Sequence, residues 1–173
     1  MKKILIILII FLSSCSPSDD KKKSDKNSNN TIEISGEIKR ISVGNIDAKI
    51  VIIAYESLTC SHCANFHKDI YPQLKKDYID TGLAKIEFRH FPLDIAAFNA
   101  SKISQCESDQ SLEILKSLYS NQQAWIKGNT AEEINNNLKK FLEEEGFKID
   151  FEKCINNKEI EDFVLNDRIE GAK

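Results

Sequence analysis

The sequence predicts an α/β domain in which a βαβ unit is followed by a helical region. Residues 49–56, KIVIIAYE, form a continuous run of β-branched and aromatic side chains, which is typical of a strand buried on both faces. Phe66, Ile70 and Leu74 then recur every four residues, as on one face of a helix. Residues 84–92, AKIEFRHFP, alternate apolar and charged side chains and predict a second strand that stops at the proline. A helical crossover between two strands makes them parallel.

Helix-capping and helix-breaking residues indicate where the predicted helix begins and ends. Thr59 is suited to cap its N-terminus, which puts Cys60 in the first turn. Pro72 falls inside the helix and should kink it, and Gly82 is well placed to end it. Upstream of the unit, residues 31–34, TIEI, predict a short edge strand.

Helical periodicity dominates from residue 94 onward. Thr130 and Glu133 have the spacing of a capping box, which predicts that a helix starts there. Further short helical pieces should contain Cys154 and then the Phe163–Val164 pair. The longer predicted helices cover residues 95–107, 111–126 and 130–145.

The N-terminal segment predicts export. Residues 1–15, MKKILIILIIFLSSC, combine two lysines, an apolar run of signal-peptide length and small residues before Cys15. We interpret Cys15 as the lipidated first residue of a bacterial lipoprotein; the alternative is an ordinary signal peptide that contains a cysteine. Residues 16–30 have no apolar side chain to bury and predict a disordered tether. The folded domain would then be residues 31–173, outside the cytoplasm.

Composition is consistent with one folded domain. The chain has 173 residues, of which 41% are hydrophobic, enough for a core. A net charge of −3 is too mild to indicate a nucleic-acid partner.

The five cysteines form two candidate pairs once lipidation of Cys15 is set aside. One is Cys60 with Cys63, and the other is Cys106 with Cys154. A disulfide across the longer loop would stabilise the fold by about 3–5 kcal/mol. We favour that disulfide because free thiols are a liability outside the cytoplasm. The alternative is two unrelated buried thiols.

The stretch TCSHC, residues 59–63, suits thiol–disulfide chemistry. Unpaired N–H groups and the positive end of the helix dipole would favour the Cys60 thiolate, lowering its pKa below the free value of about 8.5. A protonated His62 would lower it further. Cys63, one turn on and more sheltered, can resolve a mixed disulfide at Cys60.

Zinc binding is the competing hypothesis. Cys60, Cys63 and His67 have C-x₂-C-x₃-H spacing, and His90 could add a fourth ligand. We favour redox chemistry because structural zinc sites usually take ligands from loops, whereas this pair opens a helix after a buried strand. On that interpretation His67 is a surface residue, and His90 is a partly buried histidine with its hydrogen bonds satisfied.

With these motifs in view, the chain resembles the DsbA-like branch of the thioredoxin superfamily over roughly residues 45–165. The matching stretches are AKIVIIAYESLTCSHCANFH, YPQLKKDYIDTGLAKIEFRHFPLD and the helical segment opening with IAAFNASKISQC. The resemblance implies a thioredoxin fold with a helical insertion at about residues 94–165. Cys60 would be the nucleophile, Cys63 the resolving cysteine, and Ser61 and His62 the residues that tune the redox potential.

The resemblance also implies a cellular role. It predicts an oxidoreductase on the periplasmic side of the bacterial cell envelope, without a cofactor. Its partners would be exported proteins with cysteine pairs and a membrane redox partner such as a DsbB-like quinone reductase. Some DsbA-like proteins carry a second, non-catalytic disulfide, which Cys106 and Cys154 would match.

One part of the family pattern has no counterpart in the sequence. After the insertion, DsbA-like proteins continue with a cis-proline loop facing the CxxC, a β-hairpin and a last helix. This sequence stops at DRIEGAK, and its prolines are Pro17, Pro72 and Pro92. We expect a truncated form, or a shortened one completed by a partner, with one edge of the sheet unpaired. An inert relict is the remaining alternative.

Overall fold

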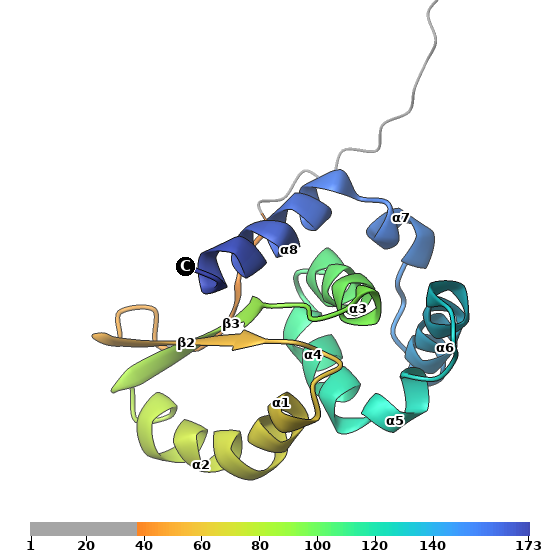
Figure 1. Ribbon diagram of the computed structural model, residues 1–173. Helices are drawn as coiled ribbons and strands as arrows, with labels where there is room; N and C mark the ends of the chain where they lie inside the picture. Colours follow the sequence, from red (N-terminus) through yellow and green to blue (C-terminus); the bar gives the residue numbers. More distant parts are fainter. Residues whose placement is uncertain (1–37) are drawn as a thin grey trace, which may run out of the picture. The chain divides into compact units, whose positions relative to one another are not determined.

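A three-stranded sheet in the order β1-β3-β2 stands at the centre of the fold (Figure 1). The computed structural model describes residues 38–173. β2 (Ile50–Glu56) runs parallel to β3 (Ala84–His90), which confirms the predicted βαβ unit, and β1 (Ile41–Gly44) pairs antiparallel with β3. The signal peptide, Cys15, the tether and the strand expected at residues 31–34 lie outside the described residues.

The crossover from β2 to β3 is one helical path with two π-helical turns. Its parts are α1 (Ser61–Asn65), η1 (Phe66–Ile70), α2 (Tyr71–Leu74) and η2 (Lys75–Ile79). Pro72 lies in the first turn of α2, directly after the first π-helical turn. Proline lacks an N–H and crowds the preceding turn, and widening that turn accommodates it. Gly82, with φ +77°, lies in the turn that follows the helical path, as predicted.

The prediction that the first strand is buried on both faces is wrong. β2 is an edge strand, and Val51, Ile53 and Tyr55 are 45%, 43% and 36% exposed on one of its faces. The opposite face carries Ile52 and Ala54, which pack against the core. A continuous apolar run cannot reveal whether both faces of its strand are covered in this chain.

Helices make up the rest of the described chain and match the predictions closely. Thr130 caps α6 by accepting a hydrogen bond from the Glu133 N–H at 3.2 Å. The helix predicted at 111–126 is divided at Asn121. The elements are α3 (Ile95–Cys106), α4 (Ser111–Ser120), α5 (Gln122–Trp125), α6 (Ala131–Glu144), α7 (Phe151–Ile155) and α8 (Lys158–Gly171).

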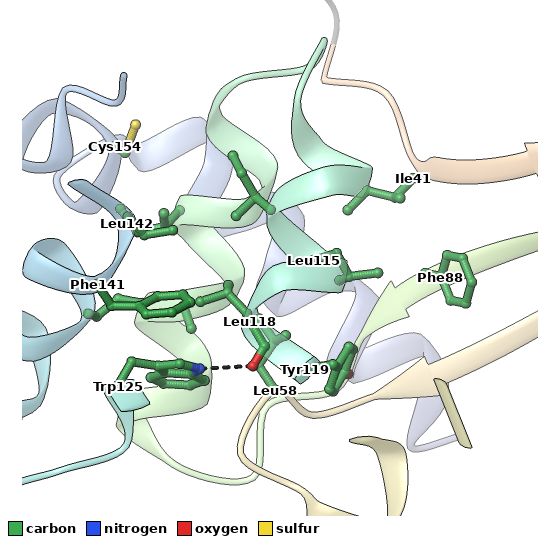
Figure 2. Packing of buried hydrophobic residues seen from close by; sticks show 14 of the residues in the cluster. Ile41, Leu58, Phe88, Leu115, Leu118, Tyr119, Trp125, Phe141, Leu142 and Cys154 are labelled. Atoms are coloured by element: carbon green, nitrogen blue, oxygen red, sulfur yellow. Dashed lines mark hydrogen bonds between the residues drawn. The ribbon is translucent and has the colours of Figure 1, made fainter. Parts of the chain in front are cut away.

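The hydrophobic core is continuous from the sheet into the helical region (Figure 2). Phe88 of β3 belongs to the same cluster as Leu115 of α4 and Leu142 of α6. Trp125 is fully buried, and its indole N–H donates to the carbonyl of Leu118 at 2.9 Å. The helical insertion therefore shares one core with the βαβ unit.

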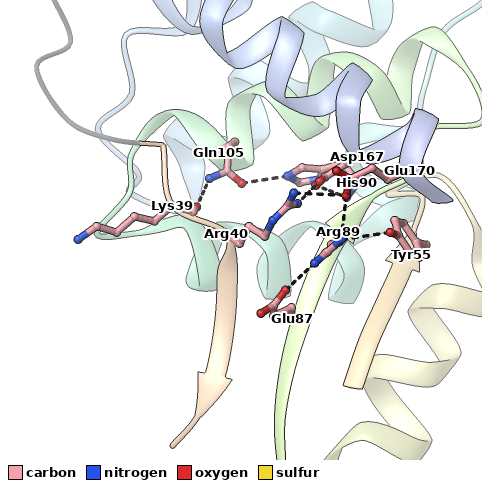
Figure 3. Close-up of polar contacts among 9 residues, drawn as sticks. All are labelled: Lys39, Arg40, Tyr55, Glu87, Arg89, His90, Gln105, Asp167 and Glu170. Carbon is pink, nitrogen blue, oxygen red and sulfur yellow. Dashed lines mark hydrogen bonds and ion pairs between the residues drawn. The ribbon is translucent and has the colours of Figure 1, made fainter. Parts of the chain in front are cut away.

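A buried polar cluster ties α8 to the sheet (Figure 3). Asp167 pairs with Arg40 and accepts a hydrogen bond from the His90 backbone N–H at 3.1 Å. Gln105 donates to the Lys39 carbonyl, so its side-chain oxygen is free to accept from the His90 ring at 3.1 Å. Burial lowers the pKa of His90 despite this hydrogen bond and the nearby Asp167. The prediction of a hydrogen-bonded His90 is confirmed, but its side chain is buried almost completely rather than partly.

Candidate active site

The loop from β2 to α1 carries the CxxC motif. Cys60 itself occupies the N-cap position, with extended backbone angles, and its N–H donates to the Ser57 carbonyl at 3.0 Å. The prediction that Thr59 caps the helix is wrong, because its hydroxyl instead donates to Asp94 at 2.7 Å. The loop is thereby fastened to the segment that follows β3, and the free N–H groups of α1 point toward the Cys60 side of the helix.

The surroundings of Cys60 favour its thiolate. Partial burial raises the pKa of Cys60, but hydrogen bonds from the Cys63 N–H, the Cys63 thiol and the His62 N–H outweigh it, so the pKa falls. Ser61 and the His62 side chain are exposed on α1. The His62 backbone N–H thus lowers the pKa of Cys60. From the sequence, we expected the protonated His62 imidazole to have this effect.

Cys63 lies in the opposite electrostatic setting. Burial raises its pKa to about 11, aided by the neighbouring Cys60 and by the charge of Glu56, although the Ser57 backbone lowers it. Both thiols are free and partly exposed. The pair is therefore asymmetric, with one sulfur prepared to attack and the other held as a thiol.

Glu56, which ends β2 four residues before Cys60, was not predicted as a site residue. Its carboxylate is 8% exposed and lies 2.8 Å from the Nε2 of His67, whose side chain is equally buried. The His67 ring stacks on Tyr119 with centroids 4.3 Å apart and packs on Phe88. The prediction of a surface His67 is wrong, because aromatic rings and the carboxylate enclose it. The sequence did offer a signal for Glu56, because it is a charged residue at the end of an otherwise apolar strand.

Gln122 was also missed. Its side-chain amide donates to the carbonyls of Leu58 and Cys60 at 2.8 and 3.0 Å and is buried beneath them. Because a buried carbonyl needs a partner, this amide holds the CxxC loop against α5. A single glutamine between two helical segments carries no sequence signal of such a role.

The second cysteine pair is joined in the structure. Cys106, at the end of α3, forms a disulfide with the fully buried Cys154 of α7. Their Cα atoms are 5.6 Å apart, within the usual range for a disulfide. This crosslink connects two helices of the insertion rather than the redox motif.

The structure gives no support to the zinc hypothesis. Within residues 38–173, the one group of three potential metal ligands is Cys106, Glu107 and Cys154, and its two sulfurs are already bonded to each other. Cys60, Cys63 and His67 do not converge, because Glu56 holds the His67 ring.

The described part of the chain matches a known protein family. A family model described as Thioredoxin matches residues 37–173. The chain belongs to the thioredoxin family. The match spans the three-stranded sheet, the crossover helix that follows Cys60 and the helical insertion.

Similar proteins include a DsbA protein of known structure. The solved structure of alpha-DsbA1 from Wolbachia pipientis is 34% identical, with a TM-score of 0.66, and the match covers 75% of this chain and 66% of that one. A Rickettsia conorii protein provisionally named a protein-disulfide oxidoreductase is 28% identical over 122 residues, or 68% of this chain and 43% of the relative.

A third relative comes from Bacillus cereus and is provisionally named disulfide bond formation protein D. It is 27% identical over 141 residues, which are 76% of this chain and 63% of the relative. The chain thus spans less than two thirds of the length of each of these relatives.

Between residues 38 and 173, no helix has both the length and the apolar character that crossing a bilayer requires.

Proposed function

We propose that this chain is an envelope thiol–disulfide oxidoreductase that exchanges disulfides with exported proteins through Cys60 and Cys63. The observation that carries the proposal is the asymmetry of the two thiols at the start of α1. The pKa of Cys60 is lowered by hydrogen bonds, whereas that of Cys63 is raised by burial. The names of two similar proteins, alpha-DsbA1 and a protein-disulfide oxidoreductase, support the same chemistry.

In the oxidising direction, a substrate thiolate attacks the Cys60 sulfur of the oxidised pair. The Cys60–Cys63 bond breaks, Cys63 leaves and takes a proton, and a mixed disulfide joins the substrate to Cys60. A second substrate thiolate then attacks the substrate sulfur of that bond and releases Cys60 as a thiolate. Two electrons pass from the substrate to the cysteine pair.

The stabilised Cys60 thiolate influences the direction of this exchange. A thiol of low pKa is a good leaving group, and stabilising the reduced pair makes the couple more oxidising. The Ser61 and His62 positions tune this property, His62 through the N–H that it directs at Cys60. A DsbB-like quinone reductase in the membrane would return the pair to the disulfide.

The location of the protein is part of the proposal. Residues 1–15 would direct export and Cys15 would carry the lipid anchor, with residues 16–30 as the tether. The Cys106–Cys154 disulfide supports a compartment in which disulfides persist. Metabolic labelling with a palmitate analogue tests the anchor, and the absence of label on the wild-type chain would reject it.

Trapping of the mixed disulfide tests the exchange. The Cys63→Ser variant cannot resolve the bond at Cys60, so it should accumulate a covalent complex with an oxidised test protein on a non-reducing gel. The Cys60→Ser variant should form none. Equal complex formation by the two variants would contradict the assignment of Cys60 as the nucleophile.

A further inference from the structure

Exposed apolar side chains gather next to the loop that carries Cys60. Leu93, Ile95 and Leu165 are 63%, 53% and 37% exposed, and they come from the segment after β3, from the start of α3 and from α8. Together with Pro92 and Phe98 they line a hollow of about 280 Å³. Apolar side chains scattered singly over a surface are ordinary, but several around one hollow mark a binding surface.

Two hydrogen bonds fasten this hollow to the CxxC loop. Thr59 donates through its hydroxyl to Asp94 at 2.7 Å, and the Leu93 N–H donates to the Ser57 hydroxyl at 3.3 Å. Thr59 directly precedes Cys60. A polypeptide whose cysteine meets Cys60 therefore brings its next few residues within reach of the hollow, since each extended residue spans about 3.3 Å.

The rim of the hollow offers a positive charge. Asp94 lines it too, but its carboxylate is engaged by the Ala97 N–H at 2.7 Å and by Thr59. Arg168 donates through Nε to the Pro92 carbonyl at 3.0 Å. Within residues 38–173, no carboxylate forms an ion pair with Arg168. Its guanidinium remains able to bind a carboxylate from outside the chain.

We propose that this hollow docks the substrate segment next to the reacting cysteine and selects an apolar side chain accompanied by a carboxylate. The inference rests on the proposed function and adds its substrate preference. An extended polypeptide is the occupant because hydrogen bonds join the segment that lines the hollow to the Cys60 loop. The apolar walls bind its side chain, and Arg168 complements its negative charge.

Three peptides test the preference with the reduced full chain. Each has one cysteine in a mixed disulfide with 2-nitro-5-thiobenzoate, followed by Leu and Glu, by Ser and Glu, or by Leu and Lys. The Cys60 thiolate opens that disulfide, and Cys63 then closes the Cys60–Cys63 bond. Peptide thiol and coloured nitrothiobenzoate are released. The Leu–Glu peptide should react about fivefold faster than either of the others, equivalent to about 1 kcal/mol.

Matched variants assign the preference to the hollow. Leu93→Asn should remove the advantage of leucine over serine, and Arg168→Gln should remove the advantage of glutamate over lysine. Arg168→Lys keeps the charge and should retain the glutamate preference. Leu83→Asn is the control, because Leu83 is 57% exposed just before β3 and does not line the hollow. The control should react like the wild type.

The possible outcomes separate this inference from the proposed function. Rapid reaction with the free nitrothiobenzoate disulfide, but equal rates for the three peptides, would overturn the docking proposal and leave the oxidoreductase proposal standing. Preferences that survive in Leu93→Asn and Arg168→Gln would do the same. A wild-type dimer that Leu93→Asn dissociates would replace substrate docking with self-association. Reaction no faster than that of an ordinary thiol would reject both proposals.

Discussion

The two cysteine pairs in the described chain have the same atoms and different chemistry. Cys60 and Cys63 are free, partly exposed and placed where the N–H groups of a helix meet the first sulfur. Cys106 and Cys154 are joined across 48 residues, and Cys154 is completely buried. The comparison shows that access and hydrogen bonding, rather than the residue type, separate an exchanging pair from a crosslinking one.

Loss of the first sulfur should have the largest effect on activity. Cys60→Ser removes the only thiolate that α1 stabilises, so disulfide exchange should fall by roughly three orders of magnitude or more. Insulin reduction measures the loss. The Cys106→Ala/Cys154→Ala variant should keep its turnover under conditions in which it remains folded. Unchanged turnover in Cys60→Ser would contradict the assignment of Cys60 and Cys63 as the exchanging pair.

Loss of the second pair should act on stability instead. In the Cys60→Ala/Cys63→Ala background, adding Cys106→Ala and Cys154→Ala should lower the free energy of unfolding by about 3–5 kcal/mol. The reason is that the unfolded chain gains the freedom of a 48-residue loop. Urea unfolding without reductant measures the difference. A loss below about 1 kcal/mol would show that the crosslink contributes little.

The two thiols of the redox pair should titrate far apart. On the reduced protein, the alkylation rate of Cys60 should reach half its maximum below the free-thiol value of about 8.5. The midpoint for Cys63 should lie near its pKa of about 11. Only the thiolate reacts, so Cys60 is modified first as the pH rises. Peptide mass spectrometry after timed quenching separates the two rates, and coincident midpoints would show that the asymmetry is absent.

The smallest predicted effect belongs to Glu56. Its negative charge raises the pKa of both Cys60 and Cys63, so Glu56→Gln should move both alkylation midpoints to lower pH. The amide can still bond to His67, which preserves the packing. Glu132→Gln, an exposed change on α6, is the control and should leave both midpoints in place. A shift to higher pH in Glu56→Gln would contradict the electrostatic account.

Local signals in the sequence predicted most of the architecture. The strand around Ile86, the helix start capped by Thr130 and the hydrogen-bonded His90 depend on spacing and neighbouring residues, and the structure reproduces them. The exposed face of β2 at Ile53 was mispredicted, because the extent of cover over a strand depends on other parts of the fold.

The candidate site was less predictable than the fold. The positions of Cys60 and Cys63 follow from their motif, but the burial of His67 depends on Glu56 and Tyr119, which meet it only after folding. Gln122 lies 62 residues after Cys60 and reaches its carbonyl through tertiary packing. Contacts between segments far apart in the chain produce no repeating pattern of residues, so a single sequence does not reveal them.

Asp167 has a consequence for the order of events during synthesis. It is 1% exposed and bridges Arg40, at the start of the described chain, to the last helix, a separation of 127 residues. The His90 backbone N–H also depends on this carboxylate. The ribosome must therefore release the chain through Asp167 before this site can close, and until then the His90 backbone N–H lacks this partner. Closing a contact between such distant segments is slow, so this end of the sheet should be completed late in folding.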